Sequence, residues 1–486
     1  MAEVGQERPA AELDAGADPF AIDAASRVRL QAQVDRAVRA GRRGGTRLVA
    51  ATWRLPSAVD PAEVVFASRR AGEAWICIEQ PERDGAAFAG VGAAITLEDR
   101  GPGRFERLAD RWRAVASAAL WEPSDGPFGS GLVAAGGFAF ADEGGGSVAW
   151  SDFAPASLVV PEVALARRDG ETWCTVAALS QPGDHPDSVL ARVEERLSAL
   201  RARPLPLLDP HPTERHQIGG SLAPEHYEAA VERAVELIRR GDIEKIVLAR
   251  EVEVHAPRAH DVAAVYDVLR GAFGGCFVFA VGRGDATLVG ASPELLIRRE
   301  GLRASTLALA GSTGRSADPA VDDHLGERML RSAKERSEHA IVAARIEREL
   351  RQHAVWVTMP SEPSVVRIAN IQHLATPIRA QLAEPVDATL LAGLLHPTPA
   401  LGGEPAERAL PLIPALEGID RGWYAGPVGW TDANGDGEFF VALRCALVEG
   451  RVARCYAGVG VVADSNPSAE LAETEVKLGA LLPVLS

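Results

Sequence analysis

Short apolar runs separated by glycine and proline turns fill the chain from about residue 46 to residue 180. Runs of this length are typical of β-strands, because an amphipathic helix needs a longer stretch of apolar residues at helical spacing. A glycine-rich stretch around 136–146 has the wrong spacing for a phosphate-binding loop, and it is interpreted as strand and turn. This region is therefore predicted to be a strand-rich half with a few helices. Two of its strand-like runs read LVVPEVALARR and TWCTVAALS.

The second half shows a more regular alternation of helical and strand patterns, after a proline-marked linker near 203–222. A strand-like run, IEKIVLAREVEV, is followed by further strands, by a long helix over about 327–352 and by a C-terminal helix over about 468–480. The pattern predicts a large α+β or α/β enzyme domain. We expect three regions: a disordered start at 1–25, a strand-rich N-terminal half at 26–220 and a catalytic region at 221–486.

Composition narrows the possible partners and the compartment. The net charge of −16 argues against nucleic acid and anionic membranes as partners. No stretch reaches 18 uncharged apolar residues, and the first 25 residues lack the pattern of a secretory signal, so no membrane segment is expected. Five scattered cysteines without a CxxC motif fit a reduced cytoplasm rather than a disulfide framework or a zinc site.

Lysine is almost absent from this chain. Of 51 basic residues only three are lysines, namely Lys245, Lys334 and Lys477, and all three lie in the second half. Codon bias with three accidental survivors is one explanation. The other is chemical: lysine can lose its proton when burial lowers its pKa, whereas arginine cannot. A general base is therefore a role that keeps lysine, and Lys245 lies in the strand-like run.

Two predicted helices carry carboxylates three residues apart, Glu335 with Glu338 and Glu470 with Glu473. Such pairs share one helix face, where like charges repel by roughly 0.2–0.5 kcal/mol. One such pair is usually a solvated surface stripe. Two pairs, each near a lysine, favour a site for a hard cation such as Mg²⁺, which binds through one or two carboxylates and retains waters.

Five single positions have both a structural and a functional interpretation. Glu294 follows a proline at a turn edge, where carboxylates are usually solvated, and a lone His373 is more often a structural hydrogen-bonding group. Arg444 interrupts an apolar run and needs an anionic partner. Gly458 and Gly460 permit close approach of a ligand to the backbone, or simply a tight strand end.

The order of several motifs resembles the chorismate-utilising enzymes, the family of anthranilate, aminodeoxychorismate, salicylate and isochorismate synthases. The resemblance covers roughly 221–486 and is looser before it, where GGFAF carries it. It implies an α+β fold built as a large two-layer antiparallel-sheet sandwich flanked by helices, acting as a monomer on chorismate. The motifs are KIVLAR, GASPELL, LALAGSTGR, AKERSEHAIV, IQHLATPI, LHPTPALGGEP, RGWYAGPVGW, VALRCALV and YAGVGVVADSNPSAELAETEVKL.

The resemblance also implies roles for the residues. Glu338 and Glu473 would be direct Mg²⁺ ligands, and Glu335 and Glu470 would be outer-shell or water-mediated ligands. The ion would orient the ring carboxylate and help the hydroxyl leave.

In the same family pattern, Lys245 would activate water for attack at ring C2, and Glu294 would protonate the departing C4 hydroxyl, near which His373 would lie. Gly311 and Lys477 would help to hold the ring carboxylate and the metal region. The groups implied for the carboxylate of the enolpyruvyl side chain are Arg444, Tyr424 and the backbone amides near Gly458 and Gly460.

Individual residues point to a branch of the family. Family members that use ammonia lack a lysine at the position of Lys245, and salicylate synthases typically have a threonine at or beside Ala400. HPTPALGGEP resembles the isochorismate synthases, so we expect an isomerase in menaquinone or siderophore biosynthesis. The alternative is a salicylate synthase, which also eliminates pyruvate. Ala400 and Leu401 are the residues that distinguish the two kinds of enzyme. A non-catalytic metal- or carboxylate-binding module is a remote alternative.

Overall fold

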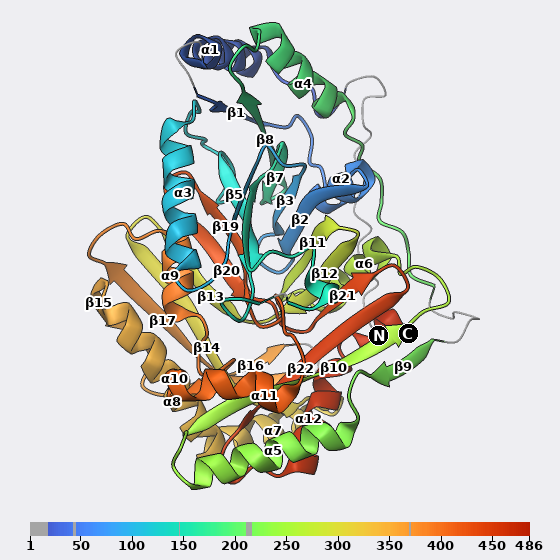
Figure 1. Cartoon of the computed structure of the whole chain (residues 1–486), viewed down its shortest axis with the longest axis vertical. Coiled ribbons are helices and arrows are strands. Elements are labelled where there is room, and N and C mark those ends of the chain that lie inside the picture. The colour runs from blue at the N-terminus through green and yellow to red at the C-terminus, as the bar shows by residue number, and fades with distance from the viewer. Residues whose placement is uncertain (1–17, 42–44, 145, 210–215, 369–370) are drawn as a thin grey trace.

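Two large antiparallel sheets form the body of the molecule (Figure 1). The computed structural model describes residues 18–41, 45–144, 146–209, 216–368 and 371–486. Within these residues the first sheet has 12 strands, of which β9 pairs with β10 beside the main path. In order across the sheet they are β1 (Arg47–Arg54), β8 (Glu171–Ser180), β7 (Val163–Arg168), β3 (Ala86–Val91), β2 (Gly72–Gln80), β11 (Phe277–Gly284), β12 (Ala286–Ser292), β21 (Cys445–Glu449), β22 (Val452–Val461), β10 (Lys245–His255) and β18 (Gly403–Glu404), with β9 (Gln217–Gly220).

The second sheet has 10 strands among the described residues, and β16 pairs with β17 beside its main path. Both sheets combine strands from before and after residue 220, so the two halves of the sequence share their sheets. The order is β15 (Ala354–Thr358), β17 (Ile371–Leu382), β14 (Arg303–Gly314), β13 (Leu295–Glu300), β20 (Gly437–Val441), β19 (Pro427–Asp432), β5 (Val133–Phe138), β6 (Ala156–Val160) and β4 (Ile95–Asp99), with β16 (Ser364–Ile368).

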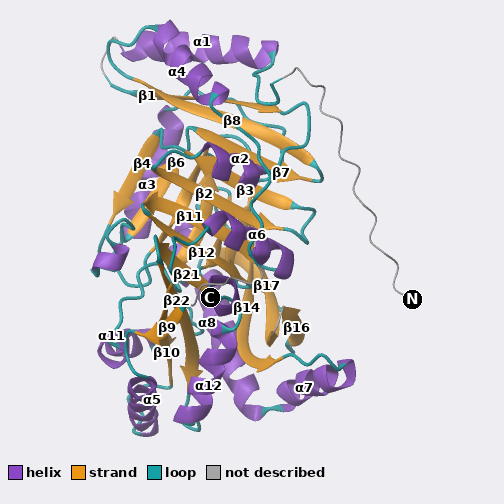
Figure 2. Ribbon diagram, turned by 90° about the vertical axis from the view of Figure 1, so that its right-hand side faces the viewer, coloured by secondary structure: helices purple, strands orange, loops and turns teal. Residues whose placement is uncertain are grey.

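Helices cover the outside of the sandwich and gather at its lower end (Figure 2). The predicted α+β class and the two-layer antiparallel architecture are confirmed. The helices are α1 (Ala24–Gly41), α2 (Pro61–Ser68), α3 (Arg104–Ala118), α4 (Pro186–Ser198), α5 (Pro224–Arg239), α6 (Val262–Ala272), α7 (Pro319–Arg331), α8 (Ala333–Arg351), α9 (Ala388–Leu395), α10 (Ala406–Ala409), α11 (Ile413–Glu417), α12 (Pro467–Leu478) and α13 (Leu482–Leu485).

The first sheet is buried on both faces, which explains its continuous apolar runs. In β11, Phe277, Phe279 and Val281 pack into the core between the two sheets. The alternate residues Val278 and Ala280 pack into a second core, which is shared with α1, α2, α4 and α6. Successive strand residues point to opposite faces, so a strand covered on both sides is apolar at every position.

The helix predicted over 327–352 is interrupted, and this part of the prediction was wrong. Ser332 separates α7 from α8 because its backbone is extended and its hydroxyl accepts a hydrogen bond from the amide of Glu335. A serine followed three residues later by a glutamate is an N-terminal capping signal, and the predicted helix ran through it. The break places Glu335 in the first turn of α8.

Two segments expected to be irregular contain ordered parts. Residues 1–17 of the stretch expected to be disordered lie outside the described residues, but Phe20 is buried and α1 begins at Ala24. The linker near 203–222 includes β9, which pairs with the far end of β10.

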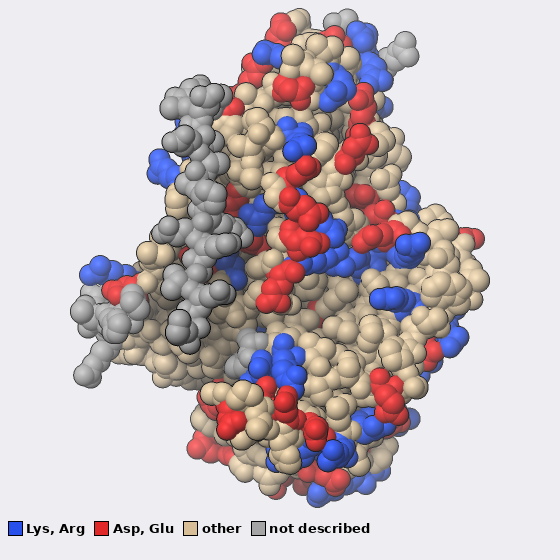
Figure 3. Space-filling view, turned by 180° about the vertical axis from the view of Figure 1, so that it is seen from behind, with Lys and Arg blue, Asp and Glu red and all other residues tan. Residues whose placement is uncertain are grey.

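The charged surface contains both signs. On the face shown in Figure 3, acidic side chains gather in a vertical band on the upper body with basic side chains beside them, uncharged surface covers much of the middle, and both signs occur again at the lower end. Within the described ranges, every helix is too short or too polar to cross a bilayer. All five cysteines are buried and have free thiols.

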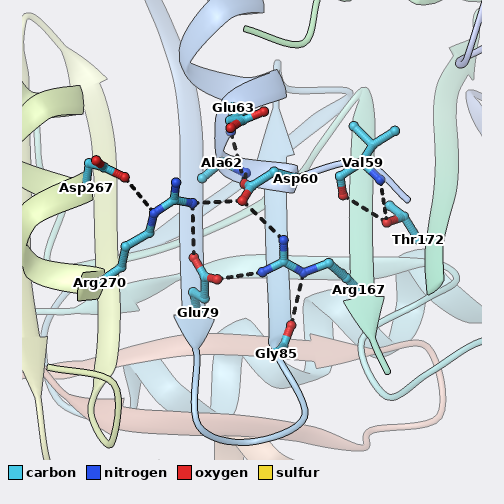
Figure 4. Close-up of polar contacts among 10 residues, drawn as sticks. All are labelled: Val59, Asp60, Ala62, Glu63, Glu79, Gly85, Arg167, Thr172, Asp267 and Arg270. Carbon is cyan, nitrogen blue, oxygen red and sulfur yellow. Dashed lines mark hydrogen bonds and ion pairs between the residues drawn. The ribbon is translucent and has the colours of Figure 1, made fainter. Parts of the chain in front are cut away.

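An ionic network joins the two halves of the chain on the outer face of the first sheet (Figure 4). Arg270 on α6 contacts Asp60 at 2.7 Å, which caps α2, and Asp267 at 2.8 Å. Arg167 on β7 contacts Asp60 at 3.2 Å and Glu79 at 2.5 Å. Although burial acts to raise the pKa of Asp60, the two arginines outweigh it and lower this pKa. Glu79 is buried and the other four members are partly buried, so losing one member leaves poorly solvated charges without partners.

We expect Arg270→Ala to lower the free energy of unfolding by roughly 1–3 kcal/mol, between the values for exposed and buried pairs, because Asp60 would lose one of its two partly buried cations. Urea unfolding followed by circular dichroism measures this. The matched control is Arg113→Ala, which breaks an exposed ion pair with Asp110 and should change stability little. Equal losses in the two variants would contradict the structural role of the network.

Candidate active site

One pocket brings together nearly all of the residues singled out in the sequence. It encloses about 970 Å³, part of it open to solvent, which lies in the range of small-molecule sites. Lys245, the remaining candidate, is fully buried behind the pocket wall and contacts Glu338, which lines the pocket. The candidates that line the pocket are Glu294, Gly311, Glu335, Glu338, His373, Ala400, Leu401, Tyr424, Arg444, Gly458, Gly460, Glu470, Glu473 and Lys477.

Lys245 is the first residue of β10, and its ammonium lies 2.7 Å from the Oε1 atom of Glu338 on α8. Gly460 on the neighbouring strand β22 makes this contact possible. A Cβ atom at Gly460 would lie 2.4 Å from that Glu338 oxygen and 3.0 Å from Cε of Lys245. Glycine at this position is therefore required by the close packing of a lysine and a glutamate, and not by backbone conformation.

The α12 side of the pocket is organised in the same way. The Lys477 ammonium lies 2.9 Å from Glu473 and donates a hydrogen bond of 2.9 Å to the Gly458 carbonyl. The Ser312 hydroxyl, next to a bulge in β14, donates a 2.7 Å hydrogen bond to Glu473. Burial acts to raise the pKa of Glu473, but Lys477 and Ser312 outweigh it and lower this pKa.

In each pair the other carboxylate, Glu335 on α8 or Glu470 on α12, has a raised pKa, because nearby positive charges do not offset the effect of burial. Burial and the nearby charge of Glu338 raise the pKa of Glu335. Burial is also the main cause of the raised pKa of Glu470, whose carboxylate lies 3.4 Å from the Lys334 ammonium. Gly311 has a left-handed φ of 77°, and a Cβ atom there would lie 2.8 Å from Glu335, so this glycine makes room for the carboxylate.

This donor set suits a hard divalent cation. Within the described chain, no three carboxylate, imidazole or thiol groups are arranged to hold an ion on their own. Mg²⁺ does not require such a cage, because it binds through one or two carboxylates and keeps waters or substrate oxygens as its other ligands. Two carboxylate pairs line the same pocket, and repulsion between neighbours contributes to the raised pKa values of Glu335 and Glu470. A cation would relieve that repulsion.

Glu294 is suited to donate a proton. It lies between β12 and β13 and is buried, although a turn-edge carboxylate is usually solvated. Burial raises its pKa to about 7, against the opposing effects of the positive charges on Lys245, Arg444 and Lys477. A carboxyl group with this pKa is protonated in a large fraction of molecules near neutral pH.

His373 and Arg444 form a hydrogen-bonded pair in the pocket wall. An Arg444 terminal nitrogen donates a 2.7 Å hydrogen bond to Nε2 of His373, whose Nδ1 lies 3.3 Å from the Gly311 carbonyl oxygen. These partners assign the proton of the neutral ring to Nδ1. Burial, with the charges of Arg444 and Lys477, lowers the His373 pKa well below its usual value.

Arg444 is also positioned to bind an anion. Its backbone has a left-handed φ of 47°, which is uncommon for a residue with a side chain and typical of functional positions. Its other terminal nitrogen is buried and has no hydrogen-bond partner among the described residues. A buried guanidinium nitrogen without a partner is costly, and a ligand carboxylate would satisfy it.

The pocket also contains polar residues that the sequence did not single out, namely Ser312 and Arg421, and it gives Lys334 a contact. Ser312 follows Gly311 directly in the motif LALAGSTGR, so its position in that motif could have identified it from the sequence. Arg421 begins the motif RGWYAG, but its partners lie in three separate segments. No local pattern reports contacts of that kind.

Comparisons with known proteins agree on one family. A family profile described as "Chorismate binding enzyme" matches residues 33–486. The "Salicylate biosynthesis isochorismate synthase" of Pseudomonas aeruginosa is 38% identical over 444 residues, covering 90% of each chain. "Isochorismate synthase MenF" of Bacillus subtilis is 33% identical over 405 residues, covering 82% of this chain and 84% of the relative. The structure of MenF, the menaquinone-specific isochorismate synthase from Escherichia coli, superimposes with a TM-score of 0.75 and 25% identity, covering 94% of this chain and all of that one.

Proposed function

This chain belongs to the chorismate binding enzyme family, and we propose that it is an isochorismate synthase, an isomerase that converts chorismate to isochorismate. The observation that carries the proposal is the chemistry of one pocket. A buried carboxyl with a pKa of about 7 and two carboxylate pairs line this pocket, and a buried lysine lies behind its wall in contact with one of those carboxylates. The family resemblance and the names of the relatives support the same reaction.

The proposed reaction balances as an exchange of hydroxyl groups. Lys245 takes a proton from water as the water oxygen bonds to ring C2, and the ring double bonds shift as the C4–O bond breaks. Glu294 gives its proton to the departing C4 oxygen, which leaves as water. The product is an isomer of the substrate, and the lysine and the carboxyl group return to their first states by exchanging one proton with solvent.

We assign the two carboxylates of chorismate to two different groups of pocket residues. Arg444, with its unpartnered nitrogen, would bind the enolpyruvyl carboxylate together with Tyr424 and the amides near Gly458 and Gly460. His373 would orient Arg444 near the departing hydroxyl, since both of its ring nitrogens have protein partners.

The ring carboxylate would lie on the glutamate side, with Gly311 and Lys477 beside it. Glu338 and Glu473 would hold a Mg²⁺ ion directly, and Glu335 and Glu470 would hold it through water. When bound, the ion would neutralise and orient the ring carboxylate and help the hydroxyl to leave.

We expect purified protein to convert chorismate to isochorismate only when Mg²⁺ is present, and to do so without ammonium. Chromatography of the products with mass detection measures this. If salicylate and pyruvate accumulate together, the protein is a salicylate synthase instead. That result would also show that Ala400 and Leu401 do not limit the reaction to isochorismate. No consumption of chorismate under these conditions would overturn the proposal.

Lys245→Arg should lose turnover almost as completely as Lys245→Ala, by about 10²–10⁴-fold, because arginine keeps the charge but cannot act as a base. Steady-state kinetics measures the loss, and calorimetric titration shows whether chorismate still binds. The control is Arg250→Lys on the same strand, which makes an ion pair with Glu475 outside the pocket and should keep its turnover. Arginine at 245 that retained most of the activity would rule out the base role.

The pH dependence of kcat should contain a descending limb near pH 7 that belongs to Glu294. Below this pH the carboxyl holds the proton that the leaving hydroxyl needs, and above it turnover should fall by about tenfold per pH unit. Glu294→Gln should be slow and lack this limb. Asp432→Asn changes another buried carboxyl, with a pKa of about 6, outside the pocket, and should keep the wild-type profile. A limb that persists in Glu294→Gln would assign it to another group.

A further inference from the structure

Among the described residues, no strand pairs with the middle of the outer edge of β10. On that edge β18 pairs with residues 245 and 246, and β9 pairs with residues 252–255. Residues 247–249, at the start of the stretch between these two short strands, are buried, and buried amides and carbonyls without partners are costly. This stretch follows Lys245 directly, so whatever completes the edge also determines how firmly the proposed base is held.

A buried ion pair takes the place of the missing strand. The Val247 carbonyl accepts a 2.9 Å hydrogen bond from a terminal nitrogen of Arg421, and the Ala249 amide donates a 2.6 Å hydrogen bond to Glu417. Arg421 and Glu417 contact each other through two hydrogen bonds, of 3.0 Å and 2.5 Å. One carbonyl and one amide of β10 thus receive the partners that a neighbouring strand would supply.

The same guanidinium group also holds the segment 397–404, which contains Ala400 and Leu401. Its other terminal nitrogen donates a 2.9 Å hydrogen bond to the Leu401 carbonyl. At the next residue the segment is tied to β10 directly, by a 2.8 Å hydrogen bond from the Val247 amide to the Gly402 carbonyl, and its last two residues pair with β10 as β18. Arg421 therefore bridges the strand that carries the proposed base and the wall of the pocket that faces the substrate.

Arg421 has little capacity left for a ligand. It lines the pocket, but its side chain is only 4% exposed. Four hydrogen bonds to protein groups use most of the five N–H groups of a guanidinium. The guanidinium also lies 4.2 Å from the centre of the Phe140 ring. The Arg421 guanidinium is thus held by protein contacts, in contrast to that of Arg444, which has a nitrogen without a partner.

We propose that the Arg421–Glu417 pair is a positioning device that fixes the segment 397–404 against the Lys245 strand and so sets the position of the proposed base relative to the pocket wall formed by Ala400 and Leu401. This inference rests on the proposed function. It adds two residues that do not contact the substrate but act through Leu401 and Val247. Lysine cannot replace Arg421, because a single ammonium cannot reach the Glu417 carboxylate and two carbonyls in the same planar geometry.

The test compares Arg421→Lys and Glu417→Gln with wild type. We expect kcat to fall by about 10- to 100-fold in each while the KM for chorismate changes by less than about threefold, because a small displacement of reacting groups affects rate more than binding. The double variant should be no worse than the more damaged single variant, since the two residues act as one unit. A raised KM with unchanged kcat would show that Arg421 binds the substrate, and would overturn the proposal.

Arg299→Lys is the matched control. Arg299 is equally buried, makes an ion pair with Asp436 at 3.0 Å and donates a 2.8 Å hydrogen bond to the Asn434 carbonyl, all outside the pocket. It should lower thermal stability without changing kcat. An equal fall in kcat in this control would attribute the effect of Arg421→Lys to general destabilisation.

Amide hydrogen exchange tests the same device without turnover. In Arg421→Lys, the amides of 247–251, of Thr398 and of 400–404 should exchange faster, while those of β14 and β17 should not. Wild-type exchange at these amides would refute the positioning role. Wild-type protein that makes no isochorismate would refute the proposed function alone, because the exchange measurement does not depend on it.

Discussion

The pairing of β10 with β22 is the contact on which the pocket depends. Its register places Val247 opposite Gly460 and Ala249 opposite Gly458. Because Gly460 has no side chain, Lys245 and Glu338 can meet across it. A shift of one residue in this register would move every side chain of β10 to the opposite face of the sheet. The long pairing between these strands therefore fixes the position of the proposed base relative to Gly460 and Glu338.

Charge organises the rest of the pocket. Each of the three lysines of the chain lies next to a different glutamate of the two helices: Lys245 beside Glu338, Lys334 beside Glu470 and Lys477 beside Glu473. The three lysines of this lysine-poor chain thus lie in one ionic cluster and not at three unrelated places. Lys334, for which the sequence indicated no role, belongs to the same cluster. An ammonium is a compact point charge, and it fits between carboxylates where the wide fork of arginine would not.

Much of the architecture was predictable because it is written in local patterns. Alternating apolar runs predicted the strands, and the spacing of Glu335 and Glu338, like that of Glu470 and Glu473, placed each pair on one helix face. The break at Ser332 was missed although the capping signal was present in the sequence, because strong helix formers on both sides of the serine are compatible with one continuous helix. The unusual burial of Glu294 was also hidden, since a turn-edge glutamate gives no local sign of what covers it.

By itself the sequence determined the class of fold, the family and the face on which each candidate residue lies. Only the tertiary structure decided which of these residues meet. Arg444 is hydrogen-bonded to His373, which is 71 residues away in the sequence, and Arg421 is hydrogen-bonded to the Val247 carbonyl, which is 174 residues away. Periodicity reports the orientation of a side chain within its own helix or strand. Contacts between elements depend instead on strand order and register, which long-range packing selects and no local pattern encodes.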